Sequence, residues 1–404
     1  MNKPLQIERP DPQPAAAPAG FALLNLGFRP FYLLASVFAA LGVLIWAAQF
    51  AAQSYAWLPA GAYLQGLPWH GHEMLFGYAS AVIAGFLLTA VRAWTNQPTP
   101  VGTPLALLAA LWLTGRVLVL TPYAGAAAWV NAAFPIAVAI AIAVPLVRSG
   151  NRRNYFFTGL LLLMACAALV FHLARQGVLA LPAQLGLAAG LDIVLFVMAV
   201  MGGRVIPMFT NNGVPGTRAG RLALIEKLAL GGILLLLCAD LIEAPAGVVL
   251  VLTLACALAH AVRLALWQPW RTFATPLVWS LHAAYAWIVV HFALRALSAA
   301  GLVDASLALH ALTVGAIGGL TLAMMTRTAR GHTGRPLKAD AWETSAYLLV
   351  QLAALARVGG GLLLPGLYVA TVIASAMLWS LAFAIYAVRY WPILSRPRVD
   401  GKPG

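Results

Sequence analysis

The chain has 404 residues, of which 62% are hydrophobic and only 9% are charged, and its mean hydropathy is +0.87. This composition excludes a soluble globular protein, because apolar segments of about twenty residues recur along the chain, and that length crosses a bilayer. The formal net charge of +14 does not indicate a nucleic-acid-binding protein, since the basic residues lie in short loops between the apolar segments. We therefore predict an all-α, polytopic membrane protein.

The first twenty residues, MNKPLQIERPDPQPAAAPAG, are rich in proline and alanine and lack the apolar stretch of a signal peptide. A segment of this composition does not build a packed core. We predict that residues 1–25 form a disordered cytoplasmic arm, that residues 26–392 form a single transmembrane helical domain, and that residues 393–404 form a cytoplasmic tail.

About twelve apolar segments follow the arm, separated by clusters of proline, glycine and asparagine such as TNQPTPVGTP and TNNGVPGTRAG. The predicted spans are Phe31–Ala51, His70–Val91, Leu105–Leu120, Ala127–Val147, Tyr155–Ala174, Ala183–Met208, Arg221–Ile242, Ala246–Leu266, Pro276–Ala296, Val303–Thr326, Trp342–Leu364 and Gly366–Tyr390.

The basic residues are distributed unevenly over the two sides that these spans define. Most of them fall on the side of both termini, whereas Arg175, Arg295 and Arg357 fall on the other side. Because positive charge is retained in the cytoplasm during insertion, this bias predicts cytoplasmic N- and C-termini and an even number of spans.

The stretch LPWHGHEMLFGY places His70, His72 and Glu73 at the outer end of the second span. Side chains that are two residues apart on an α-helix point in directions that differ by about 200° around the helix axis. Either His70 therefore lies on non-helical backbone beside His72, or the two histidines serve different partners. Glu73 follows His70 by three residues and could orient it or relay a proton. The alternative is an interfacial aromatic and polar belt around Trp69 and Tyr78.

Two further charged residues lie inside predicted spans, Arg116 in the third and Asp192 in the sixth. Ionisable groups within a bilayer cost free energy and usually mark function or a paired contact. Arg116 could pair with Glu73, with Asp192 or with the propionate of a cofactor, and the sequence does not choose among these. Glu73 and Asp192 are the candidate proton carriers.

His310 is the strongest single candidate for a ligand, because Val314 and Gly318 share its helical stripe and Gly315 lies beside it. Small residues next to a histidine would let a flat macrocycle lie against the helix. Small residues also permit close helix packing without any cofactor.

The second span echoes this pattern weakly, since His72 and His310 are each followed by a glycine five residues on and by an arginine twenty residues on, Arg92 and Arg330. The two histidines could thus ligate one iron from both faces or serve two adjacent metals.

The other histidines differ in depth. His282 lies in the inner half of the ninth span and is either a second haem ligand or a core histidine. His332 lies on the cytoplasmic side, where with Arg330 it could bind an anion or the propionates of a cofactor. We interpret His260 and His291 as structural residues.

Four separated motifs together resemble the NnrS family: LPWHGHEMLFGY in the second span, GGRVIPMFTNN in the sixth, LVWSLHAAYAW in the ninth and HALTVGAIGG with TRTARGHTGRPL in the tenth. The resemblance covers nearly the whole chain after the N-terminal arm. It implies a multi-pass protein of the bacterial inner membrane that binds haem, of b type, and copper, and that is associated with denitrification and tolerance of nitric oxide.

The resemblance further implies that His70, His72, His282 and His310 are metal ligands, with His332 and Arg204 in motifs of less defined role. Such a protein would reduce nitric oxide to nitrous oxide with electrons from a quinol or another redox carrier. Two alternatives stay open: a non-enzymatic haem-based sensor or protector of metal centres, and a membrane transporter.

Overall fold

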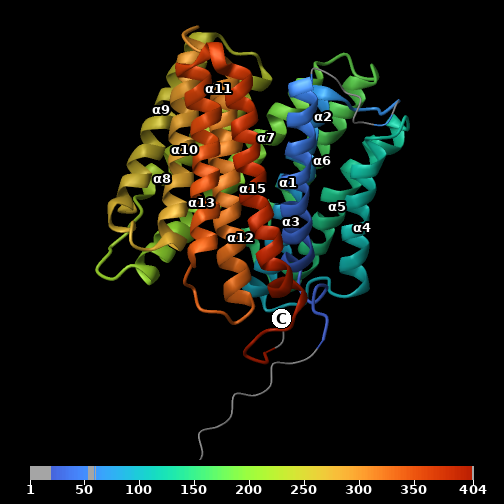
Figure 1. Cartoon of the computed structure of the whole chain (residues 1–404), viewed down its shortest axis with the longest axis vertical. Coiled ribbons are helices and arrows are strands. Elements are labelled where there is room, and N and C mark those ends of the chain that lie inside the picture. The colour runs from blue at the N-terminus through green and yellow to red at the C-terminus, as the bar shows by residue number, and fades with distance from the viewer. Residues whose placement is uncertain (1–19, 53–58, 60, 403–404) are drawn as a thin grey trace, which may run out of the picture.

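The computed structural model describes residues 20–402 except residues 53–58 and 60, and this part of the chain contains helices and no strands. The helices run side by side along the long axis of the molecule (Figure 1). Uninterrupted α-helices are α1 (Phe28–Ala52), α4 (Thr103–Leu118), α5 (Ala124–Arg148), α6 (Phe156–Arg175), α7 (Ala183–Gly213), α8 (Ala223–Leu241), α9 (Ala246–Leu266), α10 (Pro276–Ala299) and α15 (Tyr368–Ser395).

Three longer helical segments are each interrupted by a π-helix. They consist of α2, η1 and α3 (Gly66–His72, Glu73–Ala79, Ser80–Thr95), of α11, η4 and α12 (Ala305–His310, Ala311–Gly318, Gly319–His332), and of α13, η5 and α14 (Ala341–Ala354, Leu355–Gly359, Gly360–Leu363). Short 3₁₀ turns η2 (Arg152–Asn154), η3 (Pro269–Arg271) and η6 (Pro365–Leu367) lie in the connections.

Ten helical segments in the described part of the chain are long and apolar enough to cross a bilayer, which confirms a multi-pass helical membrane protein. The two remaining predicted spans are helical as well, but α4 has only 16 residues and α8 carries Glu226, Lys227 and Asp240. All twelve predicted spans therefore coincide with helices. Ten of these helical segments are also long and apolar enough to cross a bilayer.

Two of the three π-helices directly follow a predicted ligand. The first begins directly after His72, the second begins directly after His310, and the third contains Arg357. Helices with this wider turn are rare, and single turns of it often occur at functional sites. The weak sequence echo between the second and tenth spans therefore has a structural counterpart.

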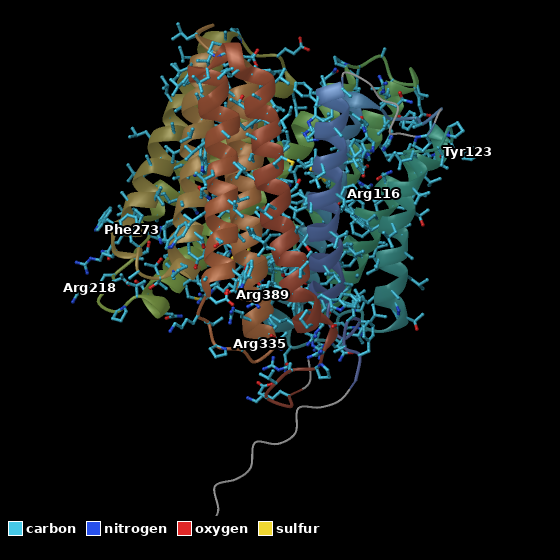
Figure 2. The ribbon with its side chains drawn as sticks, in the orientation of Figure 1. Arg116, Tyr123, Arg218, Phe273, Arg335 and Arg389 are labelled. Carbon is cyan, nitrogen blue, oxygen red and sulfur yellow. The ribbon has the colours of Figure 1, made fainter. Side chains whose placement is uncertain are left out.

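Basic side chains gather at the end of the bundle that carries the C-terminus, where Arg218, Arg335 and Arg389 lie, whereas Arg116 lies toward the opposite end (Figure 2). We call the first of these the basic end. This placement agrees with the one-sided distribution of charge in the sequence.

The segments before and after the bundle lie together at the basic end. Most of the predicted arm, residues 1–19, lies outside the described residues, but the Ala22 amide donates to the Ser395 carbonyl at 2.7 Å. In the predicted tail, the Arg398 guanidinium donates to the His332 carbonyl at 2.8 Å. The described parts of both segments are thus attached to the bundle, and α15 ends three residues beyond the predicted boundary at 392.

The glycines after His310 are covered by side chains of neighbouring helices. A Cβ atom on Gly315 would lie 2.3 Å from Trp287, and one on Gly318 would lie 2.2 Å from Trp379. The Trp379 indole donates to the Ala39 carbonyl at 3.2 Å and so cannot move freely. Along the stripe at Gly315 and Gly318, the structure shows close helix packing.

We predict that Gly318→Ala lowers the free energy of unfolding by about 1–3 kcal/mol, because the added methyl group overpacks the contact with Trp379. Gly159→Ala on α6 is the matched control, since its Cβ would meet no atom within 4 Å. Denaturant titration in mixed micelles measures both variants. Equal stability of the two would contradict the packing role.

Candidate functional site

The two histidines of the second span point to different partners. The His72 Nε2 atom lies 3.0 Å from the Nε2 atom of His172, while the His70 ring stacks on Trp46 with centroids 4.7 Å apart. Both histidines lie in α2, so the helical rotation between them separates their side chains. Of the two alternatives that the sequence leaves open, the structure has the one in which they serve different partners.

The first group, which we call the His72 cluster, consists of Tyr63, His72, Glu73, Arg116, Asn131 and His172. The Glu73 carboxylate accepts a hydrogen bond from His72 Nδ1 at 2.7 Å and one from Arg116 at 3.0 Å. Arg116 also donates to the Asn131 side-chain oxygen. Glu73 is 1% exposed and Arg116 is 8% exposed, so this charge is compensated inside the protein.

These contacts decide two further questions about the charged residues. Arg116 pairs with Glu73, which is one of its three predicted partners. Of the two roles considered for Glu73, orienting His70 or relaying a proton, the first is not the one in the structure, because the carboxylate contacts the adjacent His72.

The π-helix after His72 brings its backbone close to Arg116. A Cβ atom on Gly77 would lie 2.5 Å from the Arg116 guanidinium, so a glycine is needed for this approach. The Gly77 carbonyl accepts from the Trp112 indole at 3.0 Å, one turn before Arg116 on α4. The local sequence of η1 thus sets the position of the ion pair.

His172 completes the cluster from the end of α6. Its Nδ1 atom lies 3.2 Å from the Tyr63 hydroxyl, and that hydroxyl donates to the His172 carbonyl at 3.3 Å. Both imidazole rings, those of His72 and His172, have no exposed surface. The pair of rings is therefore fixed on its outer edges by Glu73 and Tyr63.

The second group, the His310 cluster, consists of Trp46, His70, His310, Arg357 and Tyr368. His310 Nδ1 donates to the Ser306 carbonyl at 2.7 Å, which leaves Nε2 as the unprotonated nitrogen. His70 and Arg357 lie within electrostatic range of His310. Arg357 donates to the Tyr368 hydroxyl at 3.1 Å. His72 is paired with His172, and His70 is the histidine within electrostatic range of His310. This arrangement does not favour one iron held between His72 and His310, and the alternative of two metals stays a prediction.

Two buried polar atoms in the His310 cluster have no hydrogen-bond partner among the described residues. They are the His70 Nδ1 atom and one terminal nitrogen of Arg357. Buried polar groups in proteins are nearly always hydrogen-bonded. Unpaired donors and acceptors grouped in this way are expected where a ligand supplies the missing partners.

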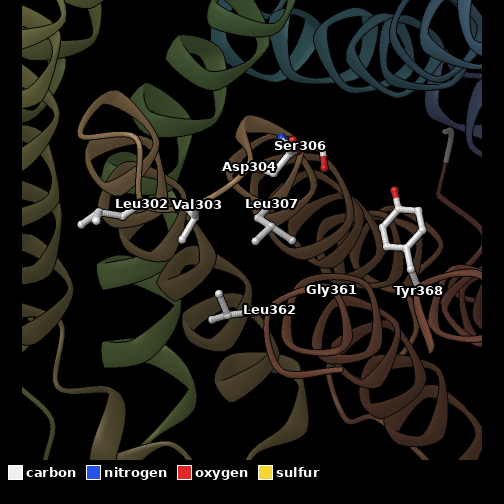
Figure 3. Close-up of a pocket in the computed structure, with 8 residues that line it drawn as sticks. All are labelled: Leu302, Val303, Asp304, Ser306, Leu307, Gly361, Leu362 and Tyr368. Atoms are coloured by element: carbon white, nitrogen blue, oxygen red, sulfur yellow. Dashed lines mark hydrogen bonds between the residues drawn. The ribbon is translucent and has the colours of Figure 1, made fainter. Parts of the chain in front are cut away.

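A pocket of about 370 Å³ adjoins this cluster, lined by Leu302, Val303, Asp304, Ser306, Leu307, Gly361, Leu362 and Tyr368 (Figure 3). Ser306 is the residue that anchors His310, and Tyr368 is the one that anchors Arg357. Asp304 caps α11, and its hydrogen bonds from Ser306 hold the pKa of the carboxyl below its ordinary value. The pocket therefore joins the two anchoring groups of the cluster.

The remaining predicted residues lie elsewhere. His282 Nε2 is 2.8 Å from the Thr210 hydroxyl, and its Nδ1 has no partner in the described chain. Asp192 is within electrostatic range of Arg295 and Asp240, which form an ion pair at 2.5 Å.

Arg330 and His332 lie at the basic end, where Arg330 is bound by both oxygens of Glu343 at 2.8 Å. His310 and His332 are 22 residues apart on one helical segment, roughly 30 Å at the rise of a helix. Arg330 and His332 are therefore far from His310, and their binding of an anion or of a cofactor's propionates stays a prediction. His260 has both ring nitrogens bonded, to Tyr285 at 2.6 Å and to the Ala229 carbonyl at 3.3 Å, as expected for a structural residue.

Sequence reasoning missed the roles of His172, Tyr63, Asn131 and Arg357. Two signals were present in the sequence: His172 ends its span near the surface at which His72 begins, and Arg357 is one of three arginines on the side that is poor in positive charge. No local pattern marks Tyr63 or Asn131, because their roles follow from contacts between distant segments.

A family model described as NnrS protein matches residues 22–398. The chain belongs to the NnrS family. No curated protein matches the chain. In this NnrS-family protein, the motif of the second span supplies both histidine clusters, and the motifs of the sixth and ninth spans meet each other through Thr210 and His282.

We predict that Arg116→Met lowers the free energy of unfolding by about 3–5 kcal/mol, because Glu73 is then left buried without its partner. Adding Glu73→Gln should recover most of this loss, since no uncompensated charge remains. The control is Arg389→Met, which breaks an exposed ion pair with Asp340 and should cost at most about 1 kcal/mol. Additive losses in the Glu73 and Arg116 double variant would contradict the pairing.

Proposed function

We propose that this NnrS-family protein is a haem- and copper-containing membrane protein that binds nitric oxide and reduces it to nitrous oxide. The observation that carries the proposal is the pair of histidine clusters in the half of the bundle away from the basic end. In both, a ring nitrogen is oriented by an oxygen atom: Glu73 for His72, and the Ser306 carbonyl for His310. This is how proteins orient histidines that bind metals.

The His310 cluster fits a haem of b type. His310 presents its Nε2 atom, and His70 has a buried, unpaired nitrogen in the described structure. The unpaired Arg357 nitrogen suits a propionate, which arginine binds well. Trp46, stacked on His70, adds aromatic surface. Arg357 is thus the proposed propionate partner at this cluster, while Arg330 and His332 stay candidates for an anion or propionates at the basic end.

His72 is the proposed copper ligand, because imidazole nitrogens are suitable ligands for copper. To bind the metal, its Nε2 atom would exchange the contact with His172 at 3.0 Å for the ion. His282 stays a candidate ligand on its unpaired Nδ1 atom, at a separate position on α10.

The proposed reaction joins two molecules of nitric oxide with two protons and two electrons to give nitrous oxide and water. When bound, the metals would supply the gas-binding and electron-transfer chemistry. The chain provides apolar surroundings that a small neutral gas can enter from lipid. Glu73, beside His72, and Asp192 are the proposed proton carriers. A quinol or another redox carrier is the proposed source of electrons.

The charge distribution supports one orientation of the bundle in the membrane. We propose that the basic end faces the cytoplasm of a bacterium, with both termini there, and that both histidine clusters lie near the outer side of the inner membrane.

The experiment is to purify the full chain in detergent, record its haem absorbance, and measure nitrous oxide formed from nitric oxide with a chemical reductant supplied. We predict that His310→Gln removes most of the haem absorbance and the gas turnover, because it removes the proposed iron ligand. His260→Gln is the matched control, since that histidine is buried and fully hydrogen-bonded within the protein.

Each outcome separates the candidate functions. Haem and nitric oxide binding without nitrous oxide would favour a sensor or a protector of metal centres over a reductase. A colourless wild-type protein that binds no nitric oxide would refute the proposal and leave the transporter.

A further inference from the structure

We infer that the basic end binds the phosphate group of an anionic phospholipid, at a site formed by five arginines that we call the arginine cluster. They come from the start of α1, from the end of α12 with the connection after it, and from the segment after α15: Arg29, Arg330, Arg335, Arg396 and Arg398. Each lies within electrostatic range of another member. The site is independent of the proposed haem and copper, and it lies where Arg335 and the C-terminus are found (Figure 2).

Hydrogen bonds within the protein bring these three segments together. Arg29 donates to the carbonyls of Leu394 and Arg396, both at 2.8 Å. Arg398 donates at 2.8 Å to the carbonyl of His332, the last residue of α12. The segment after α15 is thereby held against α1 and α12, so no ligand is needed to assemble the cluster.

The turn after α12 fixes the position of Arg335. Gly334 has a φ of +75°, a conformation that suits glycine. A Cβ atom there would lie 2.8 Å from the carboxyl carbon of Asp400, so the segment after α15 packs directly on this turn. The Arg335 amide donates to the Arg330 carbonyl at 2.9 Å. Arg335 is thus held close to Arg330 and to the C-terminal segment.

Two carboxylates neutralise part of the cluster. The oxygens of Glu343 accept from Arg330 at 2.8 Å, and the oxygens of Asp400 accept from Arg398 at 2.8 and 2.6 Å. Arg330 and Arg398 therefore have their countercharges within the protein. They help to shape the site without requiring an anion of their own.

Arg335 and Arg396 differ from these two, because neither guanidinium makes a hydrogen bond or an ion pair with any residue that the structure describes. One terminal nitrogen of Arg335 is enclosed by the protein without a partner there. Burial, and then the charges of Arg330 and Arg396, hold the pKa of the Arg335 guanidinium below its ordinary value. Neighbouring cations that lack a carboxylate are expected where an anion supplies the missing acceptors.

The general retention of positive charge on one side of a membrane explains why arginines gather at this end, but not how these are placed. Arg152 and Arg218, in other connections, are exposed, so water solvates their charges. In the cluster, by contrast, Arg29 is completely buried and Arg335 is partly buried. Donors enclosed in this way recognise an anion, whereas scattered exposed arginines only contribute to the field.

The chemistry and the depth of the site favour the phosphate of a lipid. A planar guanidinium can donate two parallel hydrogen bonds to phosphate oxygens. Two membrane-crossing segments end at His332 and Ser395, and Arg335 and Arg396 follow these ends by three residues and by one residue. Both arginines therefore lie at the level of the headgroups, where basic sites between helices recognise acidic lipids.

Apolar side chains close to these arginines in sequence fit a lipid better than a free phosphate ion. Val388 and Trp391, in the last two turns of α15, are 74% and 50% exposed, and Leu337, two residues after Arg335, is 49% exposed. Tryptophan is typical of the boundary between headgroups and acyl chains. These side chains can contact acyl chains, whereas a free phosphate ion would gain nothing from them.

The test uses the purified full-length protein in an uncharged detergent, with bound lipid counted by native mass spectrometry over a series of lipid concentrations. We expect dioleoyl phosphatidylglycerol to bind more tightly than dioleoyl phosphatidylcholine, whose headgroup has no net charge. The double variant Arg335→Gln and Arg396→Gln should weaken phosphatidylglycerol binding by about 30-fold, or roughly 5-fold for each arginine. Inorganic phosphate, compared with chloride at the same ionic strength, should not displace the lipid.

The matched control is the double variant Arg152→Gln and Arg218→Gln, which removes the same charge from exposed positions and should bind as the wild type does. Equal binding of the two lipids, wild-type affinity in the Arg335 and Arg396 variant, or an equal loss in the control would each overturn the inference. Displacement by inorganic phosphate would overturn the assignment to a lipid. If Arg335→Gln does not fold, the exposed Arg396→Gln alone decides, with an expected loss of about 5-fold. Haem and nitric oxide binding are not involved, so failure here leaves the proposed function untouched.

Discussion

The arrangement around the candidate site depends on one constraint, the burial of the Glu73 charge inside a membrane domain. A carboxylate there needs a countercharge and hydrogen-bond donors, which Arg116 and His72 supply. Meeting that need brings η1 against α4 and requires a glycine at position 77. Asn131 on α5 then holds Arg116, so helices distant in sequence are fixed around one acidic group.

The motif LPWHGHEMLFGY contributes to both the His72 cluster and the His310 cluster, because side chains two residues apart on a helix point in different directions. His72 turns toward α6 and His172, while His70 stacks on Trp46 and lies within electrostatic range of His310 at the end of α11. A π-helix follows His72 and another follows His310, and a third contains Arg357. Helices with this wider turn are rare and often occur at functional sites.

Helix positions were predictable from the sequence because apolar length and loop composition report directly on membrane spans. The location of ligand candidates on one side was predictable too, since charge asymmetry orders the spans. The pairs that these residues form were not predictable. The sequence places Glu73 near both histidines, and the structure shows that it contacts His72. The glycine stripe had two interpretations, and its tryptophan neighbours come from α10 and α15. His172, Tyr63 and Asn131 enter the site through such long-range contacts, which no local pattern encodes.

The central claim is that the buried imidazoles form two separate metal-binding groups. The most direct measurement is a cryo-electron microscopy map of the full-length protein purified from membranes of cells supplied with haem and copper, at a resolution that shows side chains. Our account predicts a compact density next to His72, and a flat, separate density next to His310 and His70. Side chains in direct contact, with no added density at either position, would contradict it.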